Sequence, residues 1–400
     1  MSDPTPDLAR LRADTPGCAE RIHLNNAGAS LMPAPVVNAA QDHLALEARI
    51  GGYEAAAMAR PAIAEAYRSM ATLLRTRPER IAFTEHATAS FAQALSAIPF
   101  ARGDVILTTR SDYVSNQIQY LSLAHRFGVE VVRAPDAAEG GVDPGAMEEL
   151  IHRRRPRLVA VTHVPTNSGL VQDVAAIGEM CRARDVLYLV DACQSVGQMP
   201  VYPEGIGADF LSGTARKFLR GPRGSGFLWV SDRVLEAGLE PLFPDLRGAD
   251  WIDADLYQPA PGARRFETWE FSWALVLATG EAARYAEGVG VEFIRERAGS
   301  LAARLRERLG EIDGVRVLDR GRKLCAIVTV SVAGWKPEAL VLELREEGIN
   351  TSSQTRMDAV LDYDSKGVEG ALRISPHYFN TEEEVDAAVE AIARRVGAAR

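Results

Sequence analysis

The sequence predicts an α/β fold in which a large domain with a mostly parallel, seven-stranded sheet precedes a smaller α+β domain. Three observations lead to this prediction. Short apolar runs alternate with helical segments between residues 80 and 230. These runs are apolar at nearly every position, which is typical of strands buried on both faces. After residue 260 the alternation gives way to a long helical stretch, and a chain of 400 residues with 47% hydrophobic content is long enough to bury both cores.

Seven apolar runs are the expected strands of the large sheet. They lie at 80–84, 104–109, 129–133, 157–162, 186–191, 208–212 and 225–230. Helical segments such as 114–127 and 173–184 separate most of the earlier runs, which is the pattern of parallel strands covered by helices. Residues 34–76 also have helical spacing, with an interruption at Gly51-Gly52.

The second domain is expected after a helical stretch at about 270–310 with a weak point near Gly288-Gly290. Its elements are strands at 315–318, 325–332 and 371–375 and helices at 336–347 and 381–396. We therefore expect three parts. Residues 1–50 form an N-terminal segment packing on the small domain, with 1–20 trailing along the surface. Residues 51–265 form the large domain, and 266–400 form a linking helix and the small domain.

Composition excludes several classes of function. A net charge of -9 argues against nucleic acid as a partner, because neutralising phosphates requires a cationic surface. The N-terminus lacks a basic start followed by an apolar core, and no run reaches the ~18 apolar residues of a membrane helix. The cysteines are far apart and fit neither a disulfide framework nor a zinc site, so we expect a cytoplasmic protein without metal or membrane contact; they are Cys18, Cys181, Cys193 and Cys325.

Lysine is scarce, and one lysine stands out. The chain has four lysines against 41 arginines, and Lys217 is the only lysine among the first 322 residues. Arginine stays protonated in proteins, whereas a lysine amine can become a nucleophile. Lys217 follows the expected strand at 208–212, and Asp191 ends the strand at 186–191. Ligands of open parallel sheets bind at these strand ends, although alone the aspartate could be structural and the lysine a surface residue.

The two residues together indicate a site for pyridoxal 5'-phosphate (PLP). The amine can form a Schiff base with this cofactor, and the carboxylate can keep the pyridine nitrogen protonated so that the ring accepts electrons. The sequence resembles the class V aminotransferase family, fold type I PLP enzymes that include cysteine desulfurases, selenocysteine lyases and isopenicillin N epimerases. Matching motifs run from HLNNAGAS at 23–30 to LRISPHYFNTEEEVD at 372–386.

The resemblance implies a role for each matching residue. Lys217 would form the Schiff base, and Asp191 would pair with the pyridine nitrogen. Residues 51–265 would be the PLP-binding domain. The other cofactor-binding candidates are Gln194 for the phenolic oxygen, Ala87, Thr88 and Thr214 for the phosphate, Tyr113 for stacking on the ring, and Thr166 or Asn167 in the loop 162–169. Thr88 could also be a helix cap and Tyr113 a core residue. Substrate binding would fall to Arg373, a planar fork suited to an α-carboxylate, and to Asn26.

Three departures from the family pattern bear on function. Arg216 stands where histidine normally precedes the lysine, and Trp269-Glu270 replaces a Gly-Thr pair that reaches a neighbouring subunit. The segment 349–354, where desulfurases carry a persulfide-forming cysteine, contains none. We therefore expect a homodimeric C–S β-lyase acting on a cysteine S-conjugate without a persulfide relay. Its alternatives are an aminotransferase or an amino-acid epimerase, and more remotely an idle PLP-binding protein.

Overall fold

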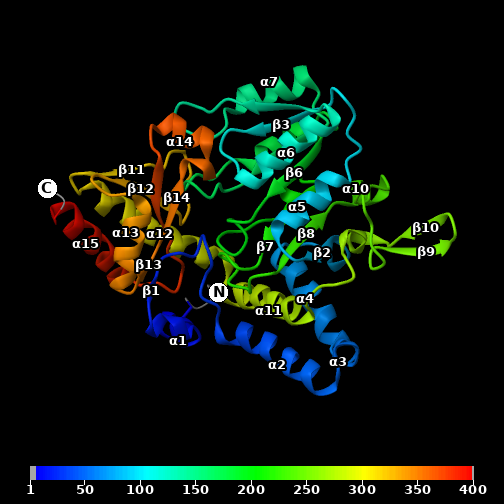
Figure 1. Ribbon diagram of the computed structural model, residues 1–400, viewed down its shortest axis with the longest axis horizontal. Coiled ribbons are helices and arrows are strands. Elements are labelled where there is room, and N and C mark those ends of the chain that lie inside the picture. The colour runs from blue at the N-terminus through cyan, green and yellow to red at the C-terminus, as the bar shows by residue number, and fades with distance from the viewer. Residues whose placement is uncertain (1–5, 399–400) are drawn as a thin grey trace, which may run out of the picture.

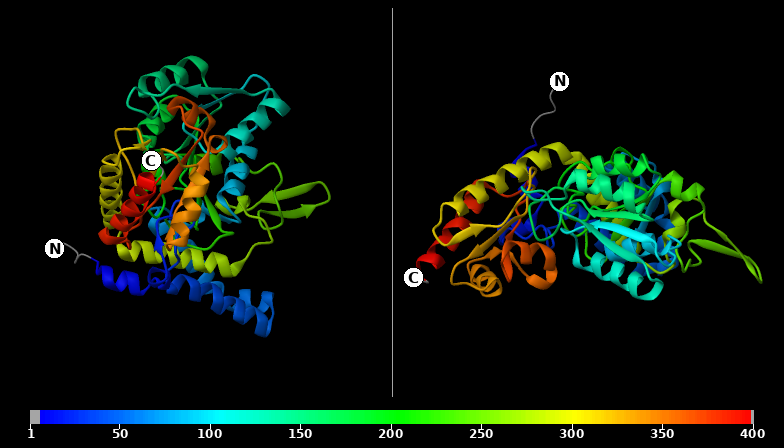
Figure 2. Two further views of the ribbon diagram at one scale, coloured as in Figure 1. Left: turned by 60° about the vertical axis from the view of Figure 1, so that its left-hand side comes forward. Right: turned by 90° about the horizontal axis from the view of Figure 1, so that it is seen from above.

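The computed structural model describes residues 6–398 and has two lobes with a helix running between them (Figures 1 and 2). The larger lobe contains a seven-stranded sheet in the order β2-β8-β7-β6-β5-β3-β4. Only β8 runs antiparallel to its neighbours. The expected α/β fold and all seven strands are confirmed, at β2 (Ile81–Thr84), β3 (Val105–Thr109), β4 (Glu130–Ala134), β5 (Leu158–Thr162), β6 (Leu187–Asp191), β7 (Phe210–Thr214) and β8 (Gly226–Val230).

Helices cover both faces of this sheet, which explains why most of its strands are apolar at nearly every position; the edge strand β4, with Glu130 exposed, is the exception. One core contains Val159, Val161 and Val190 of the strands, packed with α4, α7, α8 and α11. The other contains Leu158 and Leu189, packed with α5 and α6. Side chains of a strand alternate between faces, so a strand between two helical layers must be apolar at each position. The helices are α4 (Arg60–Leu73), α5 (Ala87–Ser96), α6 (Val114–Phe127), α7 (Pro144–Arg154), α8 (Val174–Arg182) and α11 (Trp273–Val289).

Each of the two long helical stretches is interrupted at a glycine. The first becomes α2 (Ala34–Ile50), α3 (Gly52–Met58) and α4, and the second becomes α11 and α12 (Val291–Gly310). Gly51 has a φ of 100° and Gly290 a φ of 91°, a conformation that favours glycine and ends a helix. The helices α2 and α4 pack against α11 at the base of the large lobe (Figure 1).

The small lobe contains an antiparallel sheet in the order β11-β12-β15-β14. The strands β13 and β14 and the helix α14 were not expected, because Ser, Thr and Asn dominate 350–355 and polar residues interrupt the apolar ones in 360–366. The expected strand at 325–332 begins only at Val328. The elements of the small lobe are β11 (Val315–Val317), β12 (Val328–Val332), α13 (Pro337–Glu346), β13 (Ile349–Asn350), β14 (Ser352–Thr355), α14 (Val360–Lys366), β15 (Gly370–Ile374) and α15 (Glu382–Ala398).

The N-terminal segment is ordered where the structure describes it, so the expectation of a trailing surface segment is wrong for residues 6–20. Asp7 caps α1 (Leu8–Ala13), whose Leu11 is buried, and Arg12 pairs with Glu384 at 2.8 Å. Further along, β1 (Ile22–His23) pairs with β13 of the small lobe, whereas α2 packs on α11. The domain boundaries at residues 50 and 265 stay predictions, and residues 1–5 lie outside the described residues.

A hairpin extends from the large lobe, away from both sheets (Figures 1 and 2). Its strands are β9 (Ala249–Asp253) and β10 (Leu256–Pro259), and Trp251 on it is 81% exposed. Within residues 6–398, no helix is long and apolar enough to cross a bilayer. The remaining short elements are η1 (Pro16–Ala19), η2 (Pro78–Arg80), α9 (Pro203–Ile206), α10 (Asp232–Glu236), η3 (Gly262–Phe266) and η4 (Arg356–Asp358).

Candidate active site

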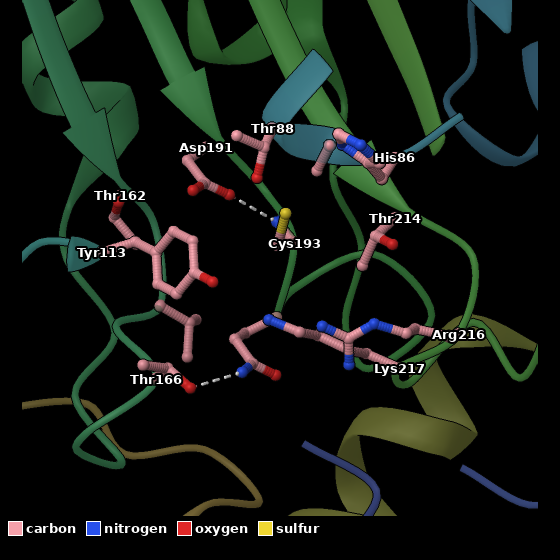
Figure 3. Close-up of a pocket in the computed structure, with 13 residues that line it drawn as sticks. His86, Thr88, Tyr113, Thr162, Thr166, Asp191, Cys193, Thr214, Arg216 and Lys217 are labelled. Carbon is pink, nitrogen blue, oxygen red and sulfur yellow. Dashed lines mark hydrogen bonds between the residues drawn. The ribbon is translucent and has the colours of Figure 1, made fainter. Parts of the chain in front are cut away.

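A pocket lies at the carboxyl ends of β5, β6 and β7 (Figure 3). The parallel strands end at one edge of the sheet, so the residues that follow them converge there although they are distant in sequence. Tyr113 lies on one side of the pocket in Figure 3, and Thr214 and Arg216 lie on the other. The lining residues are His86, Ala87, Thr88, Tyr113, Thr162, Val164, Thr166, Asp191, Cys193, Gln194, Thr214, Arg216 and Lys217.

Asp191 ends β6, and its side chain is held from two directions. Its Oδ1 accepts a hydrogen bond from the Cys193 backbone N–H at 2.9 Å, and its Oδ2 accepts one from Asn116 Nδ2 at 2.9 Å. The residue is 3% exposed. A buried carboxylate with its orientation fixed by donors is suited to pair with a cationic N–H group of a ligand.

Lys217 lies in the loop after β7 and is 7% exposed. Among the described residues, no carboxylate forms an ion pair with its ammonium group, and its Nζ lies 5.7 Å from the centre of the Tyr113 ring. Burial lowers the pKa of Lys217 to about 8, and the charges of Arg216 and Arg373 act in the same direction. An amine with this pKa is partly neutral near physiological pH and can act as a nucleophile.

The N-terminus of α5 forms another part of the wall. His86 is the N-cap residue, and its Nδ1 accepts the Ala89 N–H at 3.0 Å. Ala87 and Thr88 begin the helix and line the pocket, as does Thr214 of β7. First-turn N–H groups have no partner within the helix and form a natural site for a phosphate. Arg216, which lines the same pocket and forms no ion pair with a carboxylate of the described chain, adds positive charge.

Gln194 and Arg373 meet at Thr166. Gln194 Nε2 donates to Thr166 Oγ1 at 3.1 Å, and Arg373 Nη1 donates to the same oxygen at 2.6 Å. Arg373 does not line the pocket, but it lies directly behind Thr166. It is buried without a carboxylate partner among residues 6–398, its Nε has no hydrogen bond, and burial lowers its pKa to about 10. A buried guanidinium in this state is suited to bind a carboxylate.

Two sequence candidates lie elsewhere. Asn167 does not line the pocket: its Nδ2 donates to Asp362 Oδ2 of α14 at 2.6 Å, and the same carboxylate pairs with Lys366. Of the two candidates in this loop, only Thr166 lines the pocket. The Asn26 side chain does not line the pocket, and its Nδ2 donates to the Ser375 carbonyl, just after β15, at 2.7 Å. The geometry thus gives Asn26 a part in joining residues 23–30 to the end of β15.

The structure also adds pocket residues that sequence reasoning missed. His86 and Cys193 line the pocket, and neither was a candidate; Thr162 and Val164 also line it and belong to the predicted loop 162–169, in which only Thr166 and Asn167 were named. Cys193 follows Asp191 by two residues, and His86 precedes Ala87, so each lies beside a residue that was predicted. Their position directly after the ends of β6 and β2 is the signal that could have identified them.

Taken together, the fold, the buried lysine and the strand-end aspartate define a PLP-dependent enzyme. The chain belongs to the aminotransferase class-V family, whose model matches residues 22–388. It is 29% identical to a probable cysteine desulfurase of Methanothermobacter thermautotrophicus over 94% of both chains. The apo structure of a cysteine desulfurase from Thermococcus onnurineus NA1 superposes with a TM-score of 0.90 at 27% identity and covers 99% of both chains.

A third relative shows that other activities share this fold. The cystine C–S lyase C-DES, solved with its product cysteine persulfide, superposes with a TM-score of 0.84 at 22% identity over 95% of this chain and 99% of its own. At that identity the similarity establishes the fold alone. The family membership nonetheless makes this chain a PLP-dependent enzyme.

The residues present fit the cofactor. Gln194 Oε1 is buried without a hydrogen-bond partner among the described residues, and Gln194 lines the pocket, so this oxygen can accept the phenolic hydroxyl of PLP. Lys217, Arg216 and Arg373 are cations without an ion pair to a described carboxylate, while Asp191 is the single carboxylate of the lining. This excess of positive charge suits a ligand set that brings a phosphate and a carboxylate.

Proposed function

We propose that this enzyme is a C–S β-lyase that acts on a cysteine S-conjugate without a persulfide relay. The reaction consumes the conjugate and water and releases a thiol, pyruvate and ammonium. When PLP is bound, it supplies an electron sink that weakens the bonds to the substrate Cα. The other steps depend on the residues of this chain.

Four residues would carry the chemistry. Asp191 would hold the proton on the pyridine nitrogen, and the Tyr113 ring would stack on the cofactor. Arg373 would bind the substrate carboxylate, which would replace Thr166 Oγ1 as the acceptor of its hydrogen bond. Lys217, whose pKa of about 8 leaves a useful fraction neutral, would take the proton from Cα. The sulfur on Cβ would then leave with the electron pair of the Cβ–S bond, and the proton held by Lys217 would complete the thiol.

The observation that supports a lyase over a desulfurase is the raised pKa of the cysteine thiols. A persulfide relay needs a thiolate, and a thiolate requires an accessible thiol with a low pKa. Burial raises the pKa of Cys18, raises that of Cys193 well above its usual value, and raises those of Cys181 and Cys325 to about 12. The segment that would carry the relay cysteine is instead built into β13 and β14.

The test is a product analysis that separates the reaction types. We expect S-substituted cysteines to give pyruvate, ammonium and thiol in equal amounts without an added keto acid. Alanine and protein-bound persulfide as the products would show a desulfurase, and keto acid formed only with an acceptor would show an aminotransferase. Loss of optical activity without keto acid would show an epimerase, and each of these three outcomes would overturn the proposal.

A cysteine variant sharpens this test. Cys193 is the one cysteine in the pocket lining, and Cys18 lies outside it. We expect Cys193→Ala and Cys18→Ala each to retain pyruvate formation within about threefold, because neither thiol takes part. A loss of sulfur release confined to Cys193→Ala would contradict the absence of a relay.

We also propose that the enzyme is a homodimer with its active sites near the interface. A hollow of about 1300 Å³ is lined by α3, α4 and the segment 261–273, including Trp269 and Glu270. It lies close to α5, since Thr268 donates to Glu85 at 3.1 Å just before that helix. Trp251 of the β9–β10 hairpin is a further large, exposed apolar side chain, which the proposed interface would cover.

The oligomeric state can be tested by light scattering after size exclusion. We expect Trp251→Asp to weaken the dimer, because it places a charge in an apolar contact. Leu342→Asp is the matched control, since Leu342 is also an exposed apolar residue, at 57%, but lies on α13 of the small lobe. A monomeric wild type, or equal dissociation of both variants, would contradict this interface.

A further inference from the structure

A buried polar cluster lies behind the pocket wall, formed by Asp112, Asn116 and Thr162 (the Asp112 cluster). Asp112 is 4% exposed and forms no ion pair with a cation of the described chain. Burial raises its pKa, whereas the hydrogen bonds it accepts lower it. The donors to its carboxylate are Thr162 Oγ1 at 2.5 Å, Gln117 Nε2 at 2.7 Å, the Tyr113 N–H at 2.7 Å, Asn116 Nδ2 at 3.2 Å and Thr108 Oγ1 at 3.2 Å.

Asn116 connects this cluster to the active site. Its Nδ2 lies 2.9 Å from Asp191 Oδ2 and 3.2 Å from Asp112 Oδ1. Both neighbours are acceptors, so only the amide nitrogen can face them, and a flipped amide would place its oxygen against two carboxyl groups. Asp112 therefore fixes which atom of Asn116 is presented to Asp191.

The same carboxylate also holds Tyr113. The Tyr113 backbone N–H donates to Asp112 Oδ1, and Tyr113 is the N-cap residue of α6, the helix that carries Asn116. One buried group thus orients two parts of the pocket wall, the aromatic ring on one side and the strand-end carboxylate on another (Figure 3).

We propose that Asp112 and Asn116 are positioning residues that keep the proton on the cofactor's pyridine nitrogen through Asp191. The donors from Asn116 and from the Cys193 N–H hold the Asp191 carboxylate in one orientation. Loss of the Asn116 donor frees the carboxylate to rotate away from the ring nitrogen, and the protonated ring then loses part of the negative charge that stabilises it. The ring becomes a weaker electron acceptor. This inference rests on PLP dependence and is independent of which reaction follows.

The experiment measures the pyridine nitrogen directly. Apoenzyme is reconstituted with PLP labelled with ¹⁵N at the ring nitrogen, and its chemical shift is followed against pH in the absence of substrate. In Asn116→Leu and in Asp112→Asn, we expect the ring nitrogen to lose its proton at a pH lower by about one unit than in the wild type, because a hydrogen bond to a charged acceptor is lost or misdirected. An unchanged titration in both variants would overturn the proposal.

Gln172→Leu is the matched control for a general packing defect. Gln172 is as buried as Asn116, and its Nε2 donates to Thr109 Oγ1, to the Ser111 carbonyl and to the Thr162 carbonyl. It has no hydrogen bond to Asp112 or Asp191, so we expect a lower melting temperature with a wild-type nitrogen titration. A titration shift as large as that of Asn116→Leu would show that any buried defect has this effect and would refute the proposal.

A cofactor analogue provides a second readout. PLP methylated on the ring nitrogen carries a fixed positive charge and needs no carboxylate to hold a proton. With PLP, we expect Asn116→Leu to exchange the Cα proton of an accepted amino acid about tenfold more slowly than the wild type, with an unchanged KM. With the methylated analogue, the two proteins should exchange at equal rates. A variant that stays tenfold slower with both cofactors would contradict the proposed route through the ring nitrogen.

Discussion

The buried amine of Lys217 should make the apoprotein less stable than a variant without it. The pKa of Lys217 falls from its usual 10.5 to about 8, chiefly through burial. One pKa unit corresponds to 1.36 kcal/mol, so the charged amine costs the folded apoprotein about 3 kcal/mol at pH 7. The side chain is almost completely buried, so solvent does not screen this cost. Lys217→Met should therefore stabilise the apoprotein by about 2 to 3 kcal/mol at neutral pH.

The pH dependence of this gain has a defined sign. Below pH 8, both the folded and the unfolded amine are protonated, and the full cost is present. Between pH 8 and 10.5 the folded amine is neutral while the unfolded one still binds a proton, so the stability of the wild type rises with pH. The difference between the wild type and Lys217→Met should shrink across this window, and other titrating groups cancel in the comparison.

Urea unfolding of the two apoproteins at pH 7 and pH 10 measures this difference. Lys366→Met provides the control, because Lys366 is equally buried but pairs with Asp362 at 2.6 Å. Its removal leaves a carboxylate without its cation and should destabilise the protein by about 3 kcal/mol. If Lys217→Met is less stable than the wild type, or if its advantage does not change with pH, the reasoning about the unpaired amine is wrong.

Three further predictions follow from the geometry. In Gly226→Ala, the new Cβ would lie 2.5 Å from the His86 carbonyl carbon and 2.7 Å from the Ala87 nitrogen, so the start of α5 must move. Titration of the apoprotein should show PLP affinity reduced about tenfold or more, and unchanged affinity would exclude α5 as the phosphate site. Arg373→Lys should raise the KM for the amino acid about tenfold to a hundredfold with a smaller effect on kcat, since a bidentate contact is lost; a normal KM would place the carboxylate elsewhere. Asn167→Ala should lower the melting temperature but leave PLP affinity and KM within about twofold, because its amide bonds Asp362; a tenfold loss of PLP affinity would restore it as a cofactor ligand.

Much of the fold was predictable because burial leaves a strong pattern in the sequence. Most strands of the large sheet, such as β5 and β6, are apolar through nearly their whole length, and Gly51 and Gly290 mark the breaks in the long helices. The elements that were missed lack such a pattern. The strand β14 has the sequence Ser-Ser-Gln-Thr and is stabilised by its hydrogen-bonded pairing with β15, a contact between segments that are separate in the chain.

The sequence by itself predicted the class of this protein, a PLP-dependent enzyme. Lys217 and Asp191 follow strands whose position can be recognised locally, and the motifs around them are continuous stretches of chain. The tertiary structure alone decided which neighbours complete the site. It turned Asn167 toward Asp362, placed Arg373 behind Thr166, and brought Asn116 of α6 to the carboxylate of β6. These contacts join residues 75 to 207 positions apart, so they depend on how the sheet and the two lobes pack, which no local pattern records.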